Sequence, residues 1–257
     1  MKNKIKKIHF IGIGGSGMSG IAEVMHNLGF NISGSDSASS KVTRELKQMG
    51  IKISFKHNAR NVNNADVIVI SSAISKRNIE LKAGQKKNIP IIPRAEMLSE
   101  LMRFKKGIAV AGTHGKTSTT SILASILSEG KLDPTFVIGG RINSMKANAK
   151  LGTGDLFVVE ADESDASFLH LNPVSTILTN IDREHLETYQ GDFERLKTTY
   201  LDFIHQVPFY NNVFLCIDDD EVRKLIPLIL RPIVTYGISE KAQIKASKLV
   251  HKEERMS

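Results

Sequence analysis

The stretch GIAVAGTHGKTSTTSILASIL, residues 107–127, contains a predicted strand, a glycine loop and a predicted helix in direct succession. The apolar run Ile108–Ala111 predicts a buried strand, and the apolar spacing over Thr117–Leu127 predicts a helix. Gly112, Gly115 and Lys116 lie between this strand and this helix. They resemble the loops whose backbone N–H groups surround phosphates. The strict form of that motif has glycine at position 110, where this chain has Val110. The stretch therefore predicts a variant phosphate-binding loop between a strand and a helix.

This loop has the residue types that ATP binding requires. We expect the Lys116 ammonium on the β- and γ-phosphates and the Thr117 hydroxyl on Mg²⁺. The expected ATP-binding residues are those of the loop and the start of the helix, namely Gly112, Thr113, His114, Gly115, Lys116, Thr117 and Ser118.

Strand and helix patterns alternate on both sides of this loop. The expected strands are Ile8–Ile13, Asn31–Ser33, Lys52–Phe55, Asp66–Ser71, Ile89–Ile92, Ile108–Ala111, Phe136–Ile138, Leu156–Glu160, Thr176–Leu178, Val213–Ile217 and Ile233–Tyr236. The expected helices are Met18–Leu28, Thr43–Met49, Glu96–Met102, Thr117–Leu127 and Phe193–Phe203. Such alternation predicts α/β architecture with parallel sheets. We place one domain at 1–105, a second at 106–240 and a basic C-terminal tail at 241–257.

A second glycine loop, HFIGIGGSGMSGIAEVM, occupies residues 9–25. Gly12, Gly14 and Gly17 have G-x-G-x-x-G spacing between a predicted strand and a predicted helix. This context is typical of a nucleotide diphosphate held at a helix N-terminus. Asp36 lies 19 residues after Gly17, where it could bond a ribose hydroxyl. This loop alone is also typical of a nicotinamide or flavin oxidoreductase, but the further phosphate loop at 112–117 argues against a simple dehydrogenase.

Acidic side chains follow the predicted strand Leu156–Glu160, in the run EADESD. Carboxylates at the carboxyl end of a parallel strand lie where such sheets bind ligands, and they suit Mg²⁺. His185 follows the next predicted strand and could face the same cleft. A solvated acidic loop and a surface histidine are the alternatives.

The composition limits the possible functions. The chain has 257 residues and a net charge of +8, from 35 Lys and Arg against 27 Asp and Glu. The basic residues are not interleaved with aromatic ones, so we expect no nucleic-acid partner. Cys216 is the only cysteine, which excludes an intrachain disulfide. No apolar run approaches the ~18 residues of a membrane helix, so we expect a cytoplasmic protein without membrane insertion.

Three segments together resemble the Mur ligase family. They are GTHGKT at 112–117, VEADESDASFLHL at 159–171 and TNIDREHLETY at 179–189. The resemblance covers roughly residues 8 to 240. It implies a Rossmann-like domain that binds a UDP-linked substrate, followed by a P-loop-type ATPase α/β domain that is incomplete here. It further implies an ATP- and Mg²⁺-dependent ligase that joins L-alanine to the lactyl carboxylate of UDP-N-acetylmuramate through an acyl phosphate.

The resemblance also implies roles for individual residues. Lys116, Glu160 and His185 would be catalytic, and Thr117, Glu160 and His185 would hold metal. The expected substrate-binding residues are Gly12, Gly14, Gly15, Ser16, Gly17, Asp36, Ser71 and Ser72. Family members are much longer, so we expect the last central strands and the family's C-terminal domain to be absent. An inactive remnant that only binds nucleotides is the alternative, and the sequence leaves the oligomeric state open.

Overall fold

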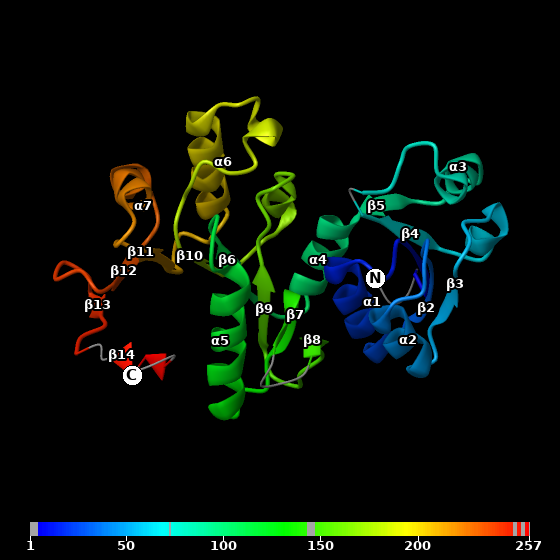
Figure 1. Ribbon diagram of the computed structural model, residues 1–257, viewed down its shortest axis with the longest axis horizontal. Coiled ribbons are helices and arrows are strands. Elements are labelled where there is room, and N and C mark those ends of the chain that lie inside the picture. The colour runs from blue at the N-terminus through cyan, green and yellow to red at the C-terminus, as the bar shows by residue number, and fades with distance from the viewer. Residues whose placement is uncertain (1–4, 72, 143–146, 249–250, 253–254, 257) are drawn as a thin grey trace. The chain divides into compact units, whose positions relative to one another are not determined.

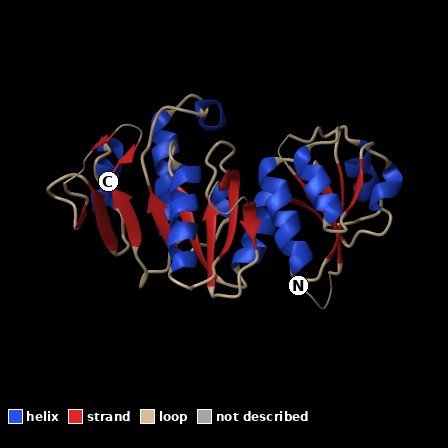
Figure 2. Ribbon diagram, turned by 60° about the horizontal axis from the view of Figure 1, so that its bottom comes forward, coloured by secondary structure: helices blue, strands red, loops and turns tan. Residues whose placement is uncertain are grey.

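The computed structural model describes residues 5–71, 73–142, 147–248, 251–252 and 255–256. The chain divides into two compact units. One comprises Met1–Lys105 with Thr120–Val159, and the other comprises Lys106–Thr119 with Glu160–Ser257. The α/β fold class predicted from the sequence is confirmed, because parallel strands alternate with helices that lie against them (Figures 1 and 2).

The first sheet has the strand order β3-β2-β1-β4-β5, with every neighbouring pair parallel. Its strands are β1 (Lys7–Ile11), β2 (Asn31–Ser35), β3 (Lys52–Ser54), β4 (Val67–Ile70) and β5 (Ile91–Pro93). The helices between them are α1 (Ser16–Asn27), α2 (Lys41–Gln48), η1 (Ala59–Val62), α3 (Ile79–Lys86) and α4 (Arg94–Met102). The strand order reverses direction between β1 and β4, and ligands of such sheets bind at this reversal.

The second sheet has the order β13-β12-β11-β10-β6-β9-β7-β8. Its strands are β6 (Lys106–Ala111), β7 (Thr135–Ile142), β8 (Ala147–Lys150), β9 (Leu156–Glu160), β10 (Ser175–Leu178), β11 (Val213–Cys216), β12 (Ile233–Gly237) and β13 (Ile244–Lys245). The helices in this part are α5 (Lys116–Glu129), η2 (Ser167–His170), η3 (Leu186–Tyr189), α6 (Phe193–His205), α7 (Asp220–Leu225) and η4 (Ile226–Leu228).

One feature of this sheet differs from the sequence prediction. β8 runs antiparallel to β7, so the sheet is mixed rather than wholly parallel. The segment expected to be a basic tail contributes β13, which pairs with β12, and the short antiparallel pair β14 (His251–Lys252) and β15 (Arg255–Met256). The described residues between 241 and 256 therefore include short strands.

Local sequence explains where the helices next to the candidate sites begin. Ser40 and Thr43 form a reciprocal capping box at the start of α2, and Asp192 accepts hydrogen bonds from Glu194 N and Arg195 N at the start of α6. Phe168 of η2 packs on Tyr200 and Phe203 of α6, with ring centroids 5.5 and 4.7 Å away. These aromatic contacts fix α6 against the segment that follows β9.

No helix in the described part of the chain is long and apolar enough to cross a membrane.

Candidate functional site

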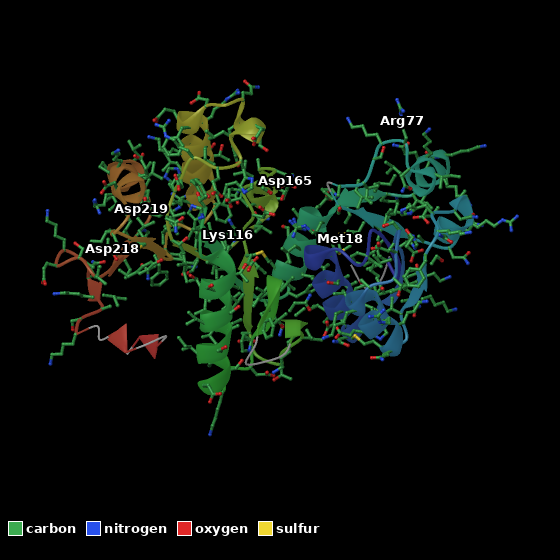
Figure 3. The ribbon with its side chains drawn as sticks, viewed as in Figure 1. Met18, Arg77, Lys116, Asp165, Asp218 and Asp219 are labelled. Atoms are coloured by element: carbon green, nitrogen blue, oxygen red, sulfur yellow. The ribbon has the colours of Figure 1, made fainter. Side chains whose placement is uncertain are left out.

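The loop between β6 and α5 has a backbone that requires glycine. Gly112 has φ +129°, and a Cβ there would lie 2.1 Å from Thr179 Oγ1 and 3.0 Å from Asn180 O. A larger residue at position 112 would therefore be strained and would collide with the segment after β10. Lys116 and Thr117 follow at the first turn of α5, and Lys116 lies at the N-terminal end of that helix (Figure 3).

Side chains that follow β10 hold this loop in place. Asn180 Oδ1 accepts from His114 N at 2.8 Å, while Asn180 Nδ2 and Thr179 Oγ1 donate to His114 O at 3.0 and 2.8 Å. The Asp182 backbone N–H donates to Thr113 Oγ1 at 2.8 Å. These hydrogen bonds tie the loop to the segment that follows β10. The sequence analysis did not single out Thr179, Asn180 or Asp182.

Among the described residues, the Lys116 ammonium contacts four acceptor atoms within 3.1 Å. They are Gly112 O at 2.7 Å, Thr113 O at 3.1 Å, and Glu163 Oε1 and Oε2 at 2.9 and 2.8 Å. The Glu163 side chain is 1% exposed and that of Lys116 is 16% exposed. Burial raises the pKa of Glu163, and the hydrogen bond and charge of Lys116 oppose that rise. Glu163 belongs to the acidic run that the sequence analysis noted, but its contact with Lys116 was not predicted.

The loop that carries Glu163 is itself anchored. The Tyr189 hydroxyl donates to Glu163 O, and the Thr188 hydroxyl donates to Ser164 O. Burial, followed by the charge of Glu163, raises the pKa of Tyr189, so this phenol stays a donor. Ala166 takes the left-handed conformation at φ +57°, and its N–H donates to Glu163 O at 3.0 Å. The carboxylate of Glu163 is therefore carried by a turn whose backbone is held by hydrogen bonds.

The other residues predicted for this site lie at the same edge of the second sheet. Glu160 is the last residue of β9 and is half-buried, and the Ala161 N–H donates to Val110 O of β6 at 2.9 Å. His185 is exposed, has φ +53° and follows β10. No hydrogen bond or ion pair of the described residues joins the His185 side chain to the loop. Among those residues there is also no group of three or more His, Cys, Asp or Glu arranged to hold a metal.

His114 of the loop, which is half exposed, contacts acidic side chains instead. Its Nε2 lies 3.1 Å from Asp182 Oδ2 and 3.9 Å from Glu184 Oε1. The backbone N–H of Arg183 and then the His114 side chain lower the pKa of Asp182. The His114 side chain therefore contacts carboxylates of the segment that follows β10.

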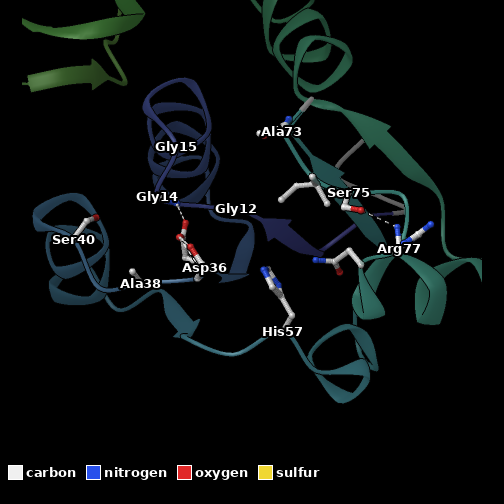
Figure 4. Close-up of a pocket in the computed structure, with 14 residues that line it drawn as sticks. Gly12, Gly14, Gly15, Asp36, Ala38, Ser40, His57, Ala73, Ser75 and Arg77 are labelled. Carbon is white, nitrogen blue, oxygen red and sulfur yellow. Dashed lines mark hydrogen bonds between the residues drawn. The ribbon is translucent and has the colours of Figure 1, made fainter.

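A pocket of about 770 Å³ lies at the carboxyl ends of the strands of the first sheet (Figure 4). Gly12, Gly14, Gly15, Asp36 and Ser71, all predicted to bind substrate, line it. Gly17 does not, because it packs against Arg94: a Cβ on Gly17 would lie 2.3 Å from the Arg94 Nη1 atom. The structure does not describe the Ser16 side chain, and Ser72 lies outside the described residues.

Asp36 is bonded to the glycine loop. Its Oδ2 accepts from Gly14 N at 2.8 Å, which Figure 4 draws as a dashed line, and its Oδ1 accepts from Ser37 N at 2.8 Å. The predicted bond from Asp36 to a ribose would thus share the carboxylate with the loop backbone.

Two pocket residues with basic side chains were not predicted. His57 and Arg77 line it, and His57 Nδ1 lies 3.1 Å from Ser35 Oγ and 3.3 Å from Glu80 Oε2. Glu80 is fully buried. Burial alone would raise its pKa, but hydrogen bonds from His9, Ser35, Asn61 and Asn58 lower it to about 2. The buried carboxylate of Glu80 therefore orients the imidazole of His57. The two residues are 23 positions apart, so no short sequence motif contains both.

Comparison with known proteins identifies the family. Residues 7–106 match the Mur ligase family, catalytic domain, and residues 110–257 match the Mur ligase middle domain. The chain belongs to the Mur ligase family. Membership in this family implies ATP use. The family predicted from the sequence is confirmed.

The curated relatives are longer than this chain. It is 57% identical over 249 residues to UDP-N-acetylmuramate–L-alanine ligase of Azoarcus sp. (strain BH72), covering 97% of this chain and 53% of that protein. The ligase of the same name from Methylobacillus flagellatus is 56% identical over 256 residues, covering 100% of this chain and 54% of that protein. This member of the Mur ligase family thus spans about half the length of the curated relatives it matches.

Solved structures share the fold. The UDP-N-acetylmuramate–alanine ligase of Thermotoga maritima matches with a TM-score of 0.81 and 31% identity, over 91% of this chain and 53% of that one. A UDP-N-acetylmuramate:L-alanyl-gamma-D-glutamyl-meso-diaminopimelate ligase from Neisseria meningitides matches with a TM-score of 0.83 and 28% identity, over 91% of this chain and 78% of that one. Mur ligases named for different amine substrates therefore resemble this part of the fold.

Proposed function

We propose that this chain provides the UDP-substrate and ATP sites of a cytoplasmic ligase of peptidoglycan synthesis. The ligase would join L-alanine to the lactyl carboxylate of UDP-N-acetylmuramate. The observation that carries the proposal is the strand–GTHGKT–helix loop with Lys116 at its helix start, in a chain 57% identical to a curated ligase of that specificity. Residues 1–105 would hold the UDP substrate and residues 106–240 the ATP.

The pocket of the first sheet supports the substrate assignment. It lies at the strand-order reversal, where nucleotides bind to such sheets, and the N-terminus of α1 begins beside it. Backbone N–H groups of the glycine loop would bind the diphosphate, and Ser71, which lines the pocket, would lie near it. Titration calorimetry on the chain with UDP-N-acetylmuramate and with NAD tests this assignment, and tighter binding of NAD would refute it.

The residues at the edge of the second sheet fit Mg²⁺. Thr117 and Glu160 offer the hydroxyl and carboxylate oxygens that this ion prefers, and Mg²⁺ usually takes its other ligands from phosphates and water. Together with His185, they are the proposed metal-binding residues. Bound Mg²⁺ would neutralise charge on the β- and γ-phosphate oxygens.

The reaction needs an activated carboxylate, because a carboxylate is a poor electrophile. The lactyl carboxylate would attack the γ-phosphorus of ATP as the bond to ADP breaks, which gives an acyl phosphate. The amine of L-alanine would then attack the acyl carbon and lose a proton, and phosphate would leave with the electron pair of the C–O bond. Lys116 would stabilise the charge on the transferred phosphoryl oxygens.

Because the chain matches about half of those relatives, nucleotide binding without ligation is a second candidate function. The test is phosphate release from Mg·ATP by the purified chain with UDP-N-acetylmuramate, with and without L-alanine. Alanine-dependent release at about 1 per second or more supports the ligase. Binding of both nucleotides without such release supports the second candidate.

A further inference from the structure

The carboxylate of Glu163 has no role in the reaction proposed above, yet it is the nearest charge to the phosphate-binding lysine. An ammonium group can donate three hydrogen bonds. Lys116 Nζ already has four acceptors, two of them the oxygens of Glu163. A phosphate oxygen can therefore reach Lys116 only if at least one of these acceptors leaves.

Glu163 is the acceptor whose departure changes the charge balance most. The two loop carbonyls are neutral and belong to the backbone around Gly112, which Thr179 and Asn180 hold in place. The carboxylate is anionic, and its side chain can rotate away while its backbone stays anchored through Tyr189. It is also the group that a polyphosphate repels.

The pair is costly to break because it is withdrawn from water. With Glu163 1% exposed and Lys116 16% exposed, separating the charges leaves each without most of its compensation. The β- and γ-phosphates of ATP would restore the compensation of Lys116 with charge-assisted hydrogen bonds. A ligand without a β-phosphate would not.

We propose that Glu163 is a positioning residue that holds Lys116 at the mouth of the loop and is exchanged for the β- and γ-phosphates when a nucleotide binds. The proposal rests on the proposed ATP site. It makes Glu163 a competitor of phosphate for Lys116, so that the loop discriminates between nucleotides by the presence of a β-phosphate.

The variant Glu163→Gln tests the exchange because it keeps the size of the side chain and removes its charge. We expect dissociation constants for ATP and ADP to fall by about tenfold, with that of AMP unchanged. In a Lys116→Met background the same substitution should leave ATP affinity unchanged. Glu187→Gln, which removes an exposed charge on η3, is the matched control and should have no effect.

A measurement without nucleotide separates this proposal from the proposed function. Acetylation of individual lysines, followed by peptide mass spectrometry, should label Lys116 slowly in the parent chain and severalfold faster in Glu163→Gln. Lys150, paired with the more exposed Asp133, is the internal reference and should be labelled at one rate in both proteins. Circular dichroism establishes that each variant folds, and Glu163→Asp, which retracts the charge by one methylene, should give intermediate labelling if Glu163→Gln does not fold.

The labelling rates and the ATP affinities together distinguish the ion pair, the exchange and the nucleotide site. Equal labelling of Lys116 in the parent chain and the variant overturns the ion pair and the proposal with it. Faster labelling with equal or weaker ATP affinity in Glu163→Gln overturns the exchange and assigns Glu163 to orienting Lys116 on the phosphates. Faster labelling with no ATP binding in either protein refutes the proposed nucleotide site and the exchange, while the ion pair stands.

Discussion

Replacement of Lys116 by methionine should destabilise the protein in a pH-dependent way. The substitution keeps the aliphatic stem and removes the ammonium, which leaves the buried carboxylate of Glu163 without its cation. The protein can respond by protonating Glu163, so the cost of protonation sets the upper limit of the part of the loss that comes from the unpaired carboxylate and depends on pH. The ordinary pKa of a glutamate, 4.5, lies about 2.5 pH units below pH 7. At about 1.36 kcal/mol per unit, the cost of protonating Glu163 at pH 7 is at most about 3.4 kcal/mol.

The sign of the pH dependence follows from the raised pKa of Glu163. A carboxyl whose pKa is higher in the folded state binds more protons there, so its effect on stability becomes less favourable as pH rises above 4.5. Lys116 opposes that rise, and its removal extends the unfavourable range further above 4.5. The pH-dependent part of the difference in unfolding free energy between the parent and Lys116→Met should therefore be at most about 3.4 kcal/mol at pH 7, at most about 2 kcal/mol at pH 6 and below about 1 kcal/mol at pH 5.

Urea denaturation followed by circular dichroism at these three pH values measures the difference. The double variant Lys116→Met with Glu163→Gln is the control, because it lacks the titrating group and should lose the pH dependence. A difference that stays constant from pH 5 to pH 7, or one below about 0.5 kcal/mol at pH 7, would show that the ion pair does not contribute as the buried geometry implies.

Three further substitutions test other parts of the structure. Glu160→Gln should weaken Mg²⁺-dependent ATP binding about tenfold in calorimetry while Mg²⁺-free binding stays the same; equal loss in both would argue against a metal ligand. Gly112→Ala should lower the unfolding free energy by about 1–3 kcal/mol in urea melts, because its Cβ would meet Thr179 Oγ1 and its φ is +129°; an unchanged midpoint would mean that the loop is not fixed there. Glu80→Gln should destabilise the chain above pH 4.5, with the loss shrinking as pH falls towards the folded pKa of about 2; a loss that grows on acidification would contradict the assigned network.

Strands with strong apolar runs could be predicted from the sequence, whereas elements that depend on distant partners could not. Leu156–Glu160 has the predicted bounds because its run is continuous. β8 (Ala147–Lys150) has no strand pattern and exists through its pairing with β7. α3 was missed because Gly84 interrupts its short pattern; a Cβ at that position would lie 2.3 Å from Ile68 Cδ1, so packing on β4 requires the glycine.

In the candidate sites, too, the groups that are close in sequence could be predicted and the contacts between distant segments could not. A motif specifies groups that are close in sequence, such as the glycines and Lys116, because one turn of chain sets their geometry. The residues that position those groups follow other strands. Asn180 accepts a hydrogen bond from the loop backbone, and Glu163 accepts from Lys116. The carboxylate of Glu163 was visible in the acidic run after β9, but its partner, like that of Asn180, depends on which strands lie side by side.

The two glycine loops show one consequence of this division. In each, a donor that we propose binds phosphate is bonded to a carboxylate of the chain itself: Gly14 N to Asp36, and Lys116 Nζ to Glu163. The first donor is a neutral amide and the second is a cation withdrawn from water, so the second pair is the harder to break. If carboxylates and phosphates compete for these donors, removing a carboxylate should increase affinity much more at Lys116 than at Gly14. The contrast between Glu163→Gln with ATP and Asp36→Asn with UDP-N-acetylmuramate therefore measures how far the charge of the donor, rather than the motif around it, determines that competition.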